Sequence, residues 1–146
     1  MGRGRQGVTH RKPILLVDDD RVDVMTAKRA LKDINVTNPV YTAGNGEEAI
    51  ELLRDEKTEK PGVILLDLNM PRMNGIEFLR LIKNDASLKR IPVVVLTTSK
   101  EEEDKVESFS LGVAGYMIKP VDYIKFVEVI RTINLYWTLS ELTELD

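Results

Sequence analysis

The stretch ILLVDDD at 14–20 decides the fold, because four consecutive aliphatic residues end there on three aspartates. Three later stretches repeat the pattern with different polar ends: VILLD at 63–67, VVVLTT at 93–98 and YMIKP at 116–120. Apolar runs of this length without polar alternation are typical of strands buried on both faces of a parallel sheet. Since ligands bind at the carboxyl ends of such strands, we expect the four polar ends to meet in one pocket.

Around these runs the sequence predicts helices and one further strand. Apolar residues at helical spacing, or acidic residues suited to a helix start, predict helices near 22–34, 47–53, 76–82, 101–112 and from 122 onward, and the segment 40–43 predicts a short strand. Asp20 is expected to cap the first helix, and Gly112 to end the fourth. Strict alternation predicts an α/β domain with a doubly wound, five-stranded parallel sheet of order 2-1-3-4-5 and helices on both faces, a flavodoxin-like topology.

Length and composition fit one compact domain without an effector module, since 42% of the 146 residues are hydrophobic. We expect a flexible basic tail at 1–11, the domain at 12–133 and an apolar C-terminal extension of the last helix at 134–146. No cysteine, apolar stretch of membrane-spanning length or signal-peptide core is present, which predicts a cytoplasmic protein that does not bind membranes. The net charge of −3 argues against a nucleic-acid-binding surface.

Three carboxylates are expected to share the pocket. Asp18 and Asp19 follow the first strand and Asp67 follows the third, and these strands are neighbours in the predicted sheet order. Carboxylates this close repel one another unless their pKa values rise or a cation lies among them. Oxygen donors without histidine or cysteine favour Mg²⁺ over zinc, and the waters that Mg²⁺ keeps can be displaced by a phosphate.

The remaining polar ends suit a transferred phosphoryl group. Asp67 stands alone at the end of the central strand, where it can act as a nucleophile and form an acyl phosphate. The ammonium group of Lys119 can pair with one phosphoryl oxygen, and the Thr97 hydroxyl can donate a hydrogen bond to another. The sequence therefore predicts a phosphoacceptor site.

These motifs resemble the receiver domain of the two-component response regulators over roughly 12–133. The residues that match the family pattern are the acidic pair Asp18 and Asp19, the phosphoacceptor Asp67 within LDLNMP at 66–71, the switch hydroxyl of Thr97, and Lys119. The resemblance implies that Asp67 receives a phosphoryl group from a phosphohistidine of a sensor histidine kinase. It also implies that Mg²⁺, or Mn²⁺ in its place, is bound by Asp19, Asp67 and the backbone carbonyl of Asn69, with Asp18 acting through water.

The resemblance assigns further residues to switching and timing. Tyr116 matches an aromatic residue that changes position as Thr97 moves toward the phosphoryl group, which alters the surface of the fourth helix, fifth strand and fifth helix. Asn69 and Ser99 match positions that tune the lifetime of the acyl phosphate, and the bond between Lys119 and Pro120 is expected to be cis. Such a domain assists its own phosphorylation and dephosphorylation without being an enzyme, and signals through protein–protein contacts or a phosphorelay.

Two other classes with a similar topology remain as alternatives. A phosphohydrolase of the haloacid-dehalogenase type also uses a strand-end aspartate and magnesium, but it needs a second acid two residues later, where this chain has Asn69. A flavodoxin-like flavin carrier needs a phosphate-binding loop after the first strand, where this chain has three acids. Both alternatives are therefore disfavoured.

The C-terminal extension continues an apolar pattern at roughly helical spacing. Its largest apolar residues include Tyr136, Trp137, Leu139 and Leu142. They either pack on the domain itself or form a surface for a second copy or a partner. The extension is similar to that of single-domain regulators that serve bacterial phytochrome kinases and form dimers. This resemblance implies a homodimer and a phytochrome-type kinase partner, while the downstream target stays open.

Overall fold

The computed structural model describes residues 11–68, 70, 72–97 and 112–145, with the backbone alone for 137–145. Five parallel strands form one sheet in the order β3-β2-β4-β5-β6, which is the predicted order 2-1-3-4-5. The strands are β2 (Ile14–Val17), β3 (Val40–Ala43), β4 (Val63–Leu66), β5 (Val93–Thr97) and β6 (Gly115–Ile118). The described helices are α1 (Arg21–Asp33), α2 (Gly46–Arg54), α3 (Gly75–Lys83) and α6 (Tyr123–Leu145).

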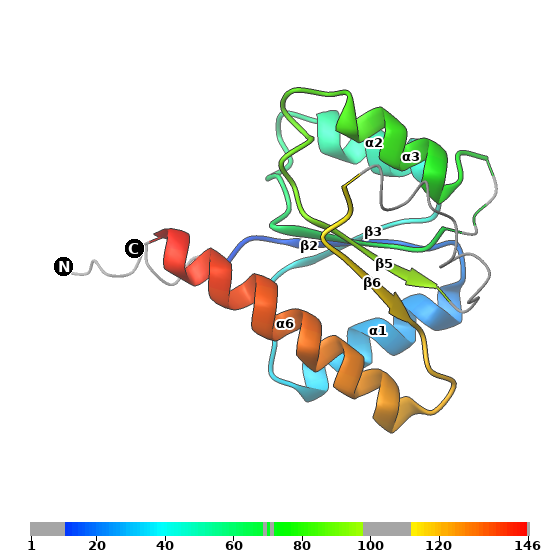
Figure 1. The fold of residues 1–146 in the computed structure, drawn as a ribbon, viewed down its shortest axis with the longest axis vertical. Helices are drawn as coiled ribbons and strands as arrows, with labels where there is room; N and C mark the ends of the chain where they lie inside the picture. The colour runs from blue at the N-terminus through cyan, green and yellow to red at the C-terminus, as the bar shows by residue number, and fades with distance from the viewer. Residues whose placement is uncertain (1–10, 69, 71, 98–111, 146) are drawn as a thin grey trace.

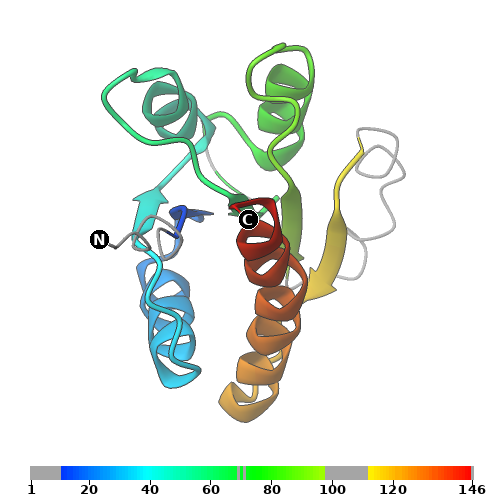
Figure 2. The same cartoon turned by 90° about the vertical axis from the view of Figure 1, so that its left-hand side faces the viewer.

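Helices cover both faces of the sheet, with α2 and α3 on one side and α1 and α6 on the other (Figures 1 and 2). Successive residues of a strand point to opposite faces, so a strand covered on both faces needs an uninterrupted apolar run. In β4, Ile64 and Leu66 pack in the core beneath α2 and α3, whereas Val63 and Leu65 pack in the core beneath α1 and α6. The apolar runs therefore predicted β2, β4 and β5 correctly, whereas the expected burial of β6 was wrong: it is only partly buried, because it lies at the edge of the sheet.

Strand register brings the polar strand ends to one edge of the sheet. Val17, the last residue of β2, is paired with Ala43 on one side and Leu66 on the other. The Asp67 amide donates a hydrogen bond of 2.9 Å to the Val17 carbonyl, so the aspartates that follow β2 and β4 begin at the same level. Where β5 and β6 end, the amide of Lys119 donates a hydrogen bond of 2.8 Å to the Thr97 carbonyl.

Local capping signals were partly predicted. Asp20 is the N-cap of α1, as expected, and its Oδ1 accepts hydrogen bonds from the amides of Val22 at 2.8 Å and Asp23 at 3.2 Å. The predicted fourth helix lies outside the described residues. Gly112, which was expected to end it, has a φ of 77°, a left-handed conformation that favours glycine.

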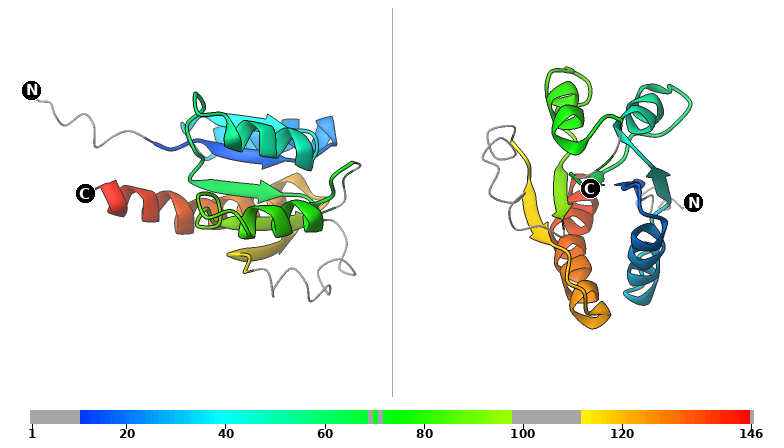
Figure 3. Two further views of the ribbon diagram at one scale, coloured as in Figure 1. Left: turned by 90° about the horizontal axis from the view of Figure 1, so that it is seen from above. Right: turned by 90° about the vertical axis from the view of Figure 1, so that its right-hand side faces the viewer.

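The last helix, α6, continues past the edge of the sheet opposite to the carboxyl ends of the strands (Figures 1 and 3). Its 23 residues run through the predicted extension without a break. Among the helices that the structure describes, none is both long and apolar enough to cross a membrane.

Candidate functional site

The three carboxylates predicted to share a pocket lie together. Each of Asp18, Asp19 and Asp67 offers an oxygen atom, and these atoms lie within 4.8 Å of one another. Asp18 and Asp67 are half-buried, whereas Asp19 is exposed and leaves the cluster open to solvent. Oxygen donors from carboxylates are the ligands that Mg²⁺ prefers, so these residues fit a magnesium ion.

Close packing fixes the backbone around Asp67. Gly75 begins α3, and its amide donates a hydrogen bond of 3.1 Å to the Leu68 carbonyl. A Cβ atom at Gly75 would lie 2.6 Å from the Leu68 Cα and 2.8 Å from the Asp67 carbonyl oxygen. Only glycine therefore allows α3 to start this close to the strand end. Asn74 and Glu77 form a capping box that stabilises the same turn.

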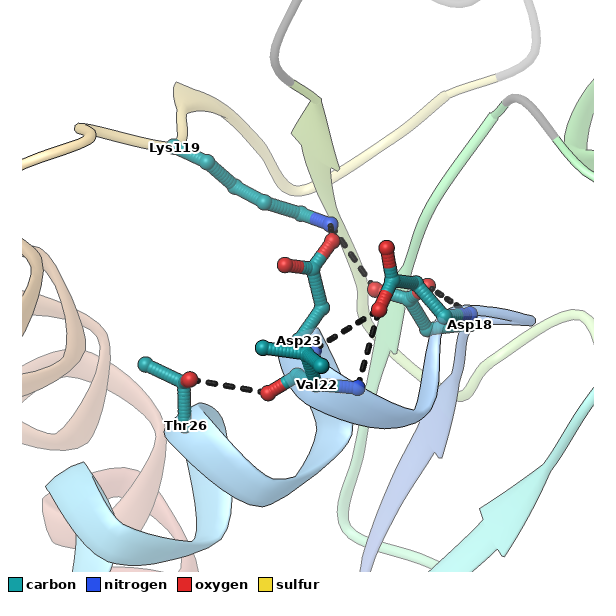
Figure 4. A network of polar contacts seen from close by, with 6 residues as sticks. Asp18, Val22, Asp23, Thr26 and Lys119 are labelled. Atoms are coloured by element: carbon teal, nitrogen blue, oxygen red, sulfur yellow. Dashed lines mark hydrogen bonds and ion pairs between the residues drawn. The ribbon is translucent and has the colours of Figure 1, made fainter.

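Lys119 reaches the carboxylates from the loop that follows β6. Its Nζ atom lies 2.8 Å from Asp18 Oδ2 and 2.9 Å from Asp23 Oδ2, and its side chain is only 9% exposed (Figure 4). The sequence did not predict the role of Asp23, which looks like an ordinary acid in a first helical turn. The expected cis bond before Pro120 was wrong, since no described peptide bond is cis. A trans bond is the lower-energy form for most prolines and suffices to direct Lys119 inward.

Burial and pairing act in opposite directions on these charges. Burial raises the pKa of Asp18 above its ordinary value of 3.8, although the hydrogen bond from Lys119 partly opposes this change. Burial would lower the pKa of Lys119, but its hydrogen bonds to Asp18 and Asp23 and the charge of Asp67 outweigh burial and raise it above 10.5. The ammonium group therefore stays charged, and Asp18 binds a proton more readily than an exposed aspartate.

Thr97 and Tyr116 lie on neighbouring strands. Thr97 is the last residue of β5 and is 1% exposed. Val95 pairs with Tyr116 on β6, and Thr97 lies two residues after Val95 on β5. Tyr116 therefore lies diagonally across from Thr97 on the neighbouring strand. Asn69 and Ser99, which the sequence also assigned to the site, lie outside the described residues.

A cavity of about 330 Å³ adjoins the charged groups. Asp18, Asp23, Asp67 and Lys119 line it together with apolar side chains that include Leu16, Ala27, Leu96 and Phe126. The charged groups therefore meet at a hollow between α1, the sheet and the start of α6.

The C-terminal candidates are only partly described. Tyr136 is 67% exposed on α6 and its neighbour Leu135 is also exposed. Interpretations that depend on the side chains of Trp137, Leu139 and Leu142 lie outside the described residues.

The family model of the response regulator receiver domain matches residues 14–131, and the chain belongs to this family. Among individual relatives, response regulator Rcp1 of Synechocystis sp. is 36% identical over 130 residues, which cover 86% of this chain and 88% of Rcp1. The phosphorylated cyanobacterial phytochrome response regulator RcpA has a similar structure, with a TM-score of 0.81 and 39% identity over 88% of this chain and 94% of RcpA. The Mn²⁺-bound form of Rcp1 follows with a TM-score of 0.78 and 36% identity, covering 86% of this chain and 94% of Rcp1.

Family membership confirms the general predictions. The protein is a phosphoacceptor of two-component signalling with the receiver fold, and a sensor histidine kinase is its implied partner. It is not a classical enzyme, and the haloacid-dehalogenase alternative is not supported. Receiver domains bind Mg²⁺, which agrees with the cluster of Asp18, Asp19 and Asp67.

Proposed function

We propose that Asp67 is the residue that accepts the phosphoryl group. The observation that carries this proposal is the convergence of three carboxylates and Lys119 at the carboxyl edge of the sheet. In the proposed reaction an Asp67 oxygen attacks the phosphorus of a kinase phosphohistidine and forms the P–O bond. The P–N bond breaks, and the histidine nitrogen keeps the electron pair.

The side chains around Asp67 have distinct roles in this proposal. Asp19, Asp67 and the backbone carbonyl of Asn69 would hold Mg²⁺ directly and Asp18 would hold it through water; when bound, the ion neutralises charge on the phosphoryl oxygens. Lys119 pairs with one phosphoryl oxygen as a compact positive charge. Through these groups the domain assists its own phosphorylation and dephosphorylation.

Phosphorylation is proposed to change the surface that includes β6 and α6. The Thr97 hydroxyl donates a hydrogen bond to the phosphoryl group, and Tyr116 on the neighbouring strand changes position with it. The surface that includes β6 and α6 then has two states, and the phosphoryl group shifts their populations. Asn69 and Ser99 are proposed to set the lifetime of the acyl phosphate.

Intact mass measured before and after addition of acetyl phosphate tests the role of Asp67. We expect a gain of one phosphoryl group that requires Mg²⁺, disappears with a chelator and is absent from Asp67→Asn. Asp55→Asn is the matched control, because Asp55 is exposed at the end of α2 and should leave the gain unchanged. Labelling of Asp67→Asn to the wild-type level would contradict the proposal.

The proposed setting is cytoplasmic, with a phytochrome-type histidine kinase as partner. Similarity to RcpA and Rcp1 supports this partner, since RcpA is a phytochrome response regulator. A kinase of another sensory type that transferred its phosphoryl group at least as fast as a phytochrome kinase would contradict this assignment. The downstream target is proposed to be reached through protein–protein contacts or a phosphorelay.

A homodimer through the C-terminal part of α6 is also proposed. The exposed Tyr136 and its neighbour Leu135 support it, and Trp137, Leu139 and Leu142 complete the proposed surface. In this view 1–11 is a tail, 12–133 is the domain and 134–146 is an extension for association. Light scattering on a chain that ends at Ile133, which is buried in the core, is expected to show a monomer where the full chain shows a dimer. An unchanged oligomeric state would contradict the proposed surface.

A further inference from the structure

The ammonium group of Lys119 lies between two carboxylates that belong to different parts of the site. Asp18 Oδ2 is 2.8 Å away and Asp23 Oδ2 is 2.9 Å away. Figure 4 shows the lysine reaching from the loop after β6 to the first turn of α1, where Asp23 meets it. Asp18 is a member of the carboxylate cluster near Asp67, whereas Asp23 is not. Lys119 therefore has one partner inside the proposed metal site and one outside it.

The position of Asp23 is built into the start of α1. The N-cap Asp20 accepts hydrogen bonds from the amides of Val22 and Asp23, and its own amide donates a hydrogen bond of 2.9 Å to Oδ1 of Asp18, which follows β2. The Lys119 side chain is 9% exposed and that of Asp23 is 37% exposed. Charge-assisted hydrogen bonds are stronger than neutral ones, and limited exposure reduces their screening by water. The contact is therefore strong enough to influence where Lys119 resides.

On the basis of the proposed function of Asp67, we propose that Asp23 is a positioning residue that controls the availability of Lys119. When Asp18 binds a divalent cation, its carboxylate no longer offers full negative charge to the ammonium group, and the cation repels that group. Asp23 then keeps Lys119 paired at the rim of the site. When Asp67 carries a phosphoryl group, Asp23 competes with the phosphoryl oxygens for the same ammonium.

This role predicts effects of opposite sign when the Asp23 charge is removed. Without Asp23, Lys119 pairs with Asp18 alone and competes more strongly with Mg²⁺, so magnesium affinity falls. Once Mg²⁺ is saturating, Lys119 has no partner at the rim and is available to an incoming phosphoryl group, so phosphorylation becomes faster. A purely structural contact would lower both quantities or neither.

The test compares Asp23→Asn with Asp20→Asn and Asp23→Glu in the full chain. Asp20→Asn removes a nearby negative charge that does not contact Lys119, and asparagine is an equally good N-cap. Asp23→Glu keeps the charge and serves as the conservative rescue. Mg²⁺ affinity is measured by calorimetry at about 0.15 M salt, where distant charges are largely screened. The rate of labelling by acetyl phosphate is then measured by intact mass at saturating Mg²⁺.

For Asp23→Asn we expect Mg²⁺ affinity to fall about fivefold and the labelling rate to rise about threefold, as suits one partly exposed charge-assisted contact. Both quantities should change by less than about twofold in Asp20→Asn and Asp23→Glu. Equal effects of Asp23→Asn and Asp20→Asn, or a fall in both quantities for Asp23→Asn, would overturn the proposal. The Mg²⁺ titration needs no phosphorylation, so it judges Asp23 even if Asp67 were not the phosphoacceptor.

Discussion

In β4 the residues Val63–Leu66 are buried and apolar, whereas Asp67, which follows them directly, is charged and half-buried. The same change occurs where Asp18 follows β2, whereas β6, which leads into Lys119, is only partly buried. Burial of the strand interiors stabilises the fold, because apolar side chains leave water. The strand ends instead bring like charges together, which costs stability and suits metal and phosphoryl binding. In β2 and β4, the buried residues that stabilise the fold are thus followed directly in the sequence by the carboxylates of the site.

The largest effect on stability is expected from the strand interior. Leu66→Ala removes a fully buried side chain from the core beneath α2 and α3, and should lower the free energy of unfolding by about 2–5 kcal/mol. Urea denaturation followed by circular dichroism measures this change. Thr42→Ala is a control within the same sheet, because Thr42 is exposed on β3 and should cost far less. Equal losses from the two variants would remove the distinction between interior and surface.

A change at the strand end should affect binding and spare stability. In Asp18→Asn the costly buried charge is lost while Lys119 keeps Asp23, so the free energy of unfolding should stay the same or rise by less than about 1 kcal/mol. Magnesium affinity should fall about tenfold, because the carboxylate that holds the metal through water is lost. Calorimetry and urea denaturation of the same preparation measure both. A clear loss of stability without a loss of Mg²⁺ affinity would contradict the comparison.

The pH dependence of stability in acid should reflect the raised pKa of Asp18. Since burial raises the folded-state pKa of Asp18 above 3.8, the folded protein binds more protons there than the unfolded chain as the pH falls from that raised value toward 3.8. In metal-free buffer, this group's contribution therefore increases stability as the pH falls. The difference in unfolding free energy between wild type and Asp18→Asn isolates it. The free energy of unfolding of the wild type should rise relative to that of the variant as the pH falls. The opposite trend would show that pairing with Lys119 dominates.

Magnesium binding should have the opposite dependence on pH. Protons compete with Mg²⁺ for Asp18, and the raised pKa lets them compete at a higher pH than at an ordinary aspartate. Affinity measured by calorimetry should therefore fall as the pH is lowered. Asp18→Asn should show a weaker dependence, and a dependence equal to that of the wild type would assign the titration to another group.

The smallest effect is expected where neither strand interiors nor strand ends are touched. Tyr123 at the start of α6 donates a hydrogen bond of 2.7 Å to Asp33 Oδ2 on α1, and the Arg29 guanidinium lies 4.5 Å from the centre of its ring. Tyr123→Phe keeps the ring and removes only this solvent-accessible hydrogen bond. Stability should change far less than in Leu66→Ala, with Mg²⁺ affinity unchanged. A calorimetric titration that differed from wild type would connect this contact to the site.

The sequence predicted the sheet and the carboxylate cluster because both depend on short, local patterns. Apolar runs specify strands covered on two faces, and the parallel order then places Asp18 beside Asp67 without knowledge of side-chain positions. The contact between Lys119 and Asp23 joins residues 96 positions apart and depends on how the first turn of α1 is oriented. No spacing rule encodes that orientation, so Asp23 was indistinguishable from an acid that favours a helix start.

The most direct measurement locates the phosphoryl group itself. Protein labelled with acetyl phosphate and Mg²⁺ is treated with borohydride, which reduces an aspartyl phosphate to homoserine, and is then digested and sequenced by mass spectrometry. The account predicts homoserine at position 67 and unmodified aspartate at 18, 19 and 23. Homoserine at one of those three positions, with Asp67 intact, would contradict the central claim that the end of β4 carries the phosphoacceptor.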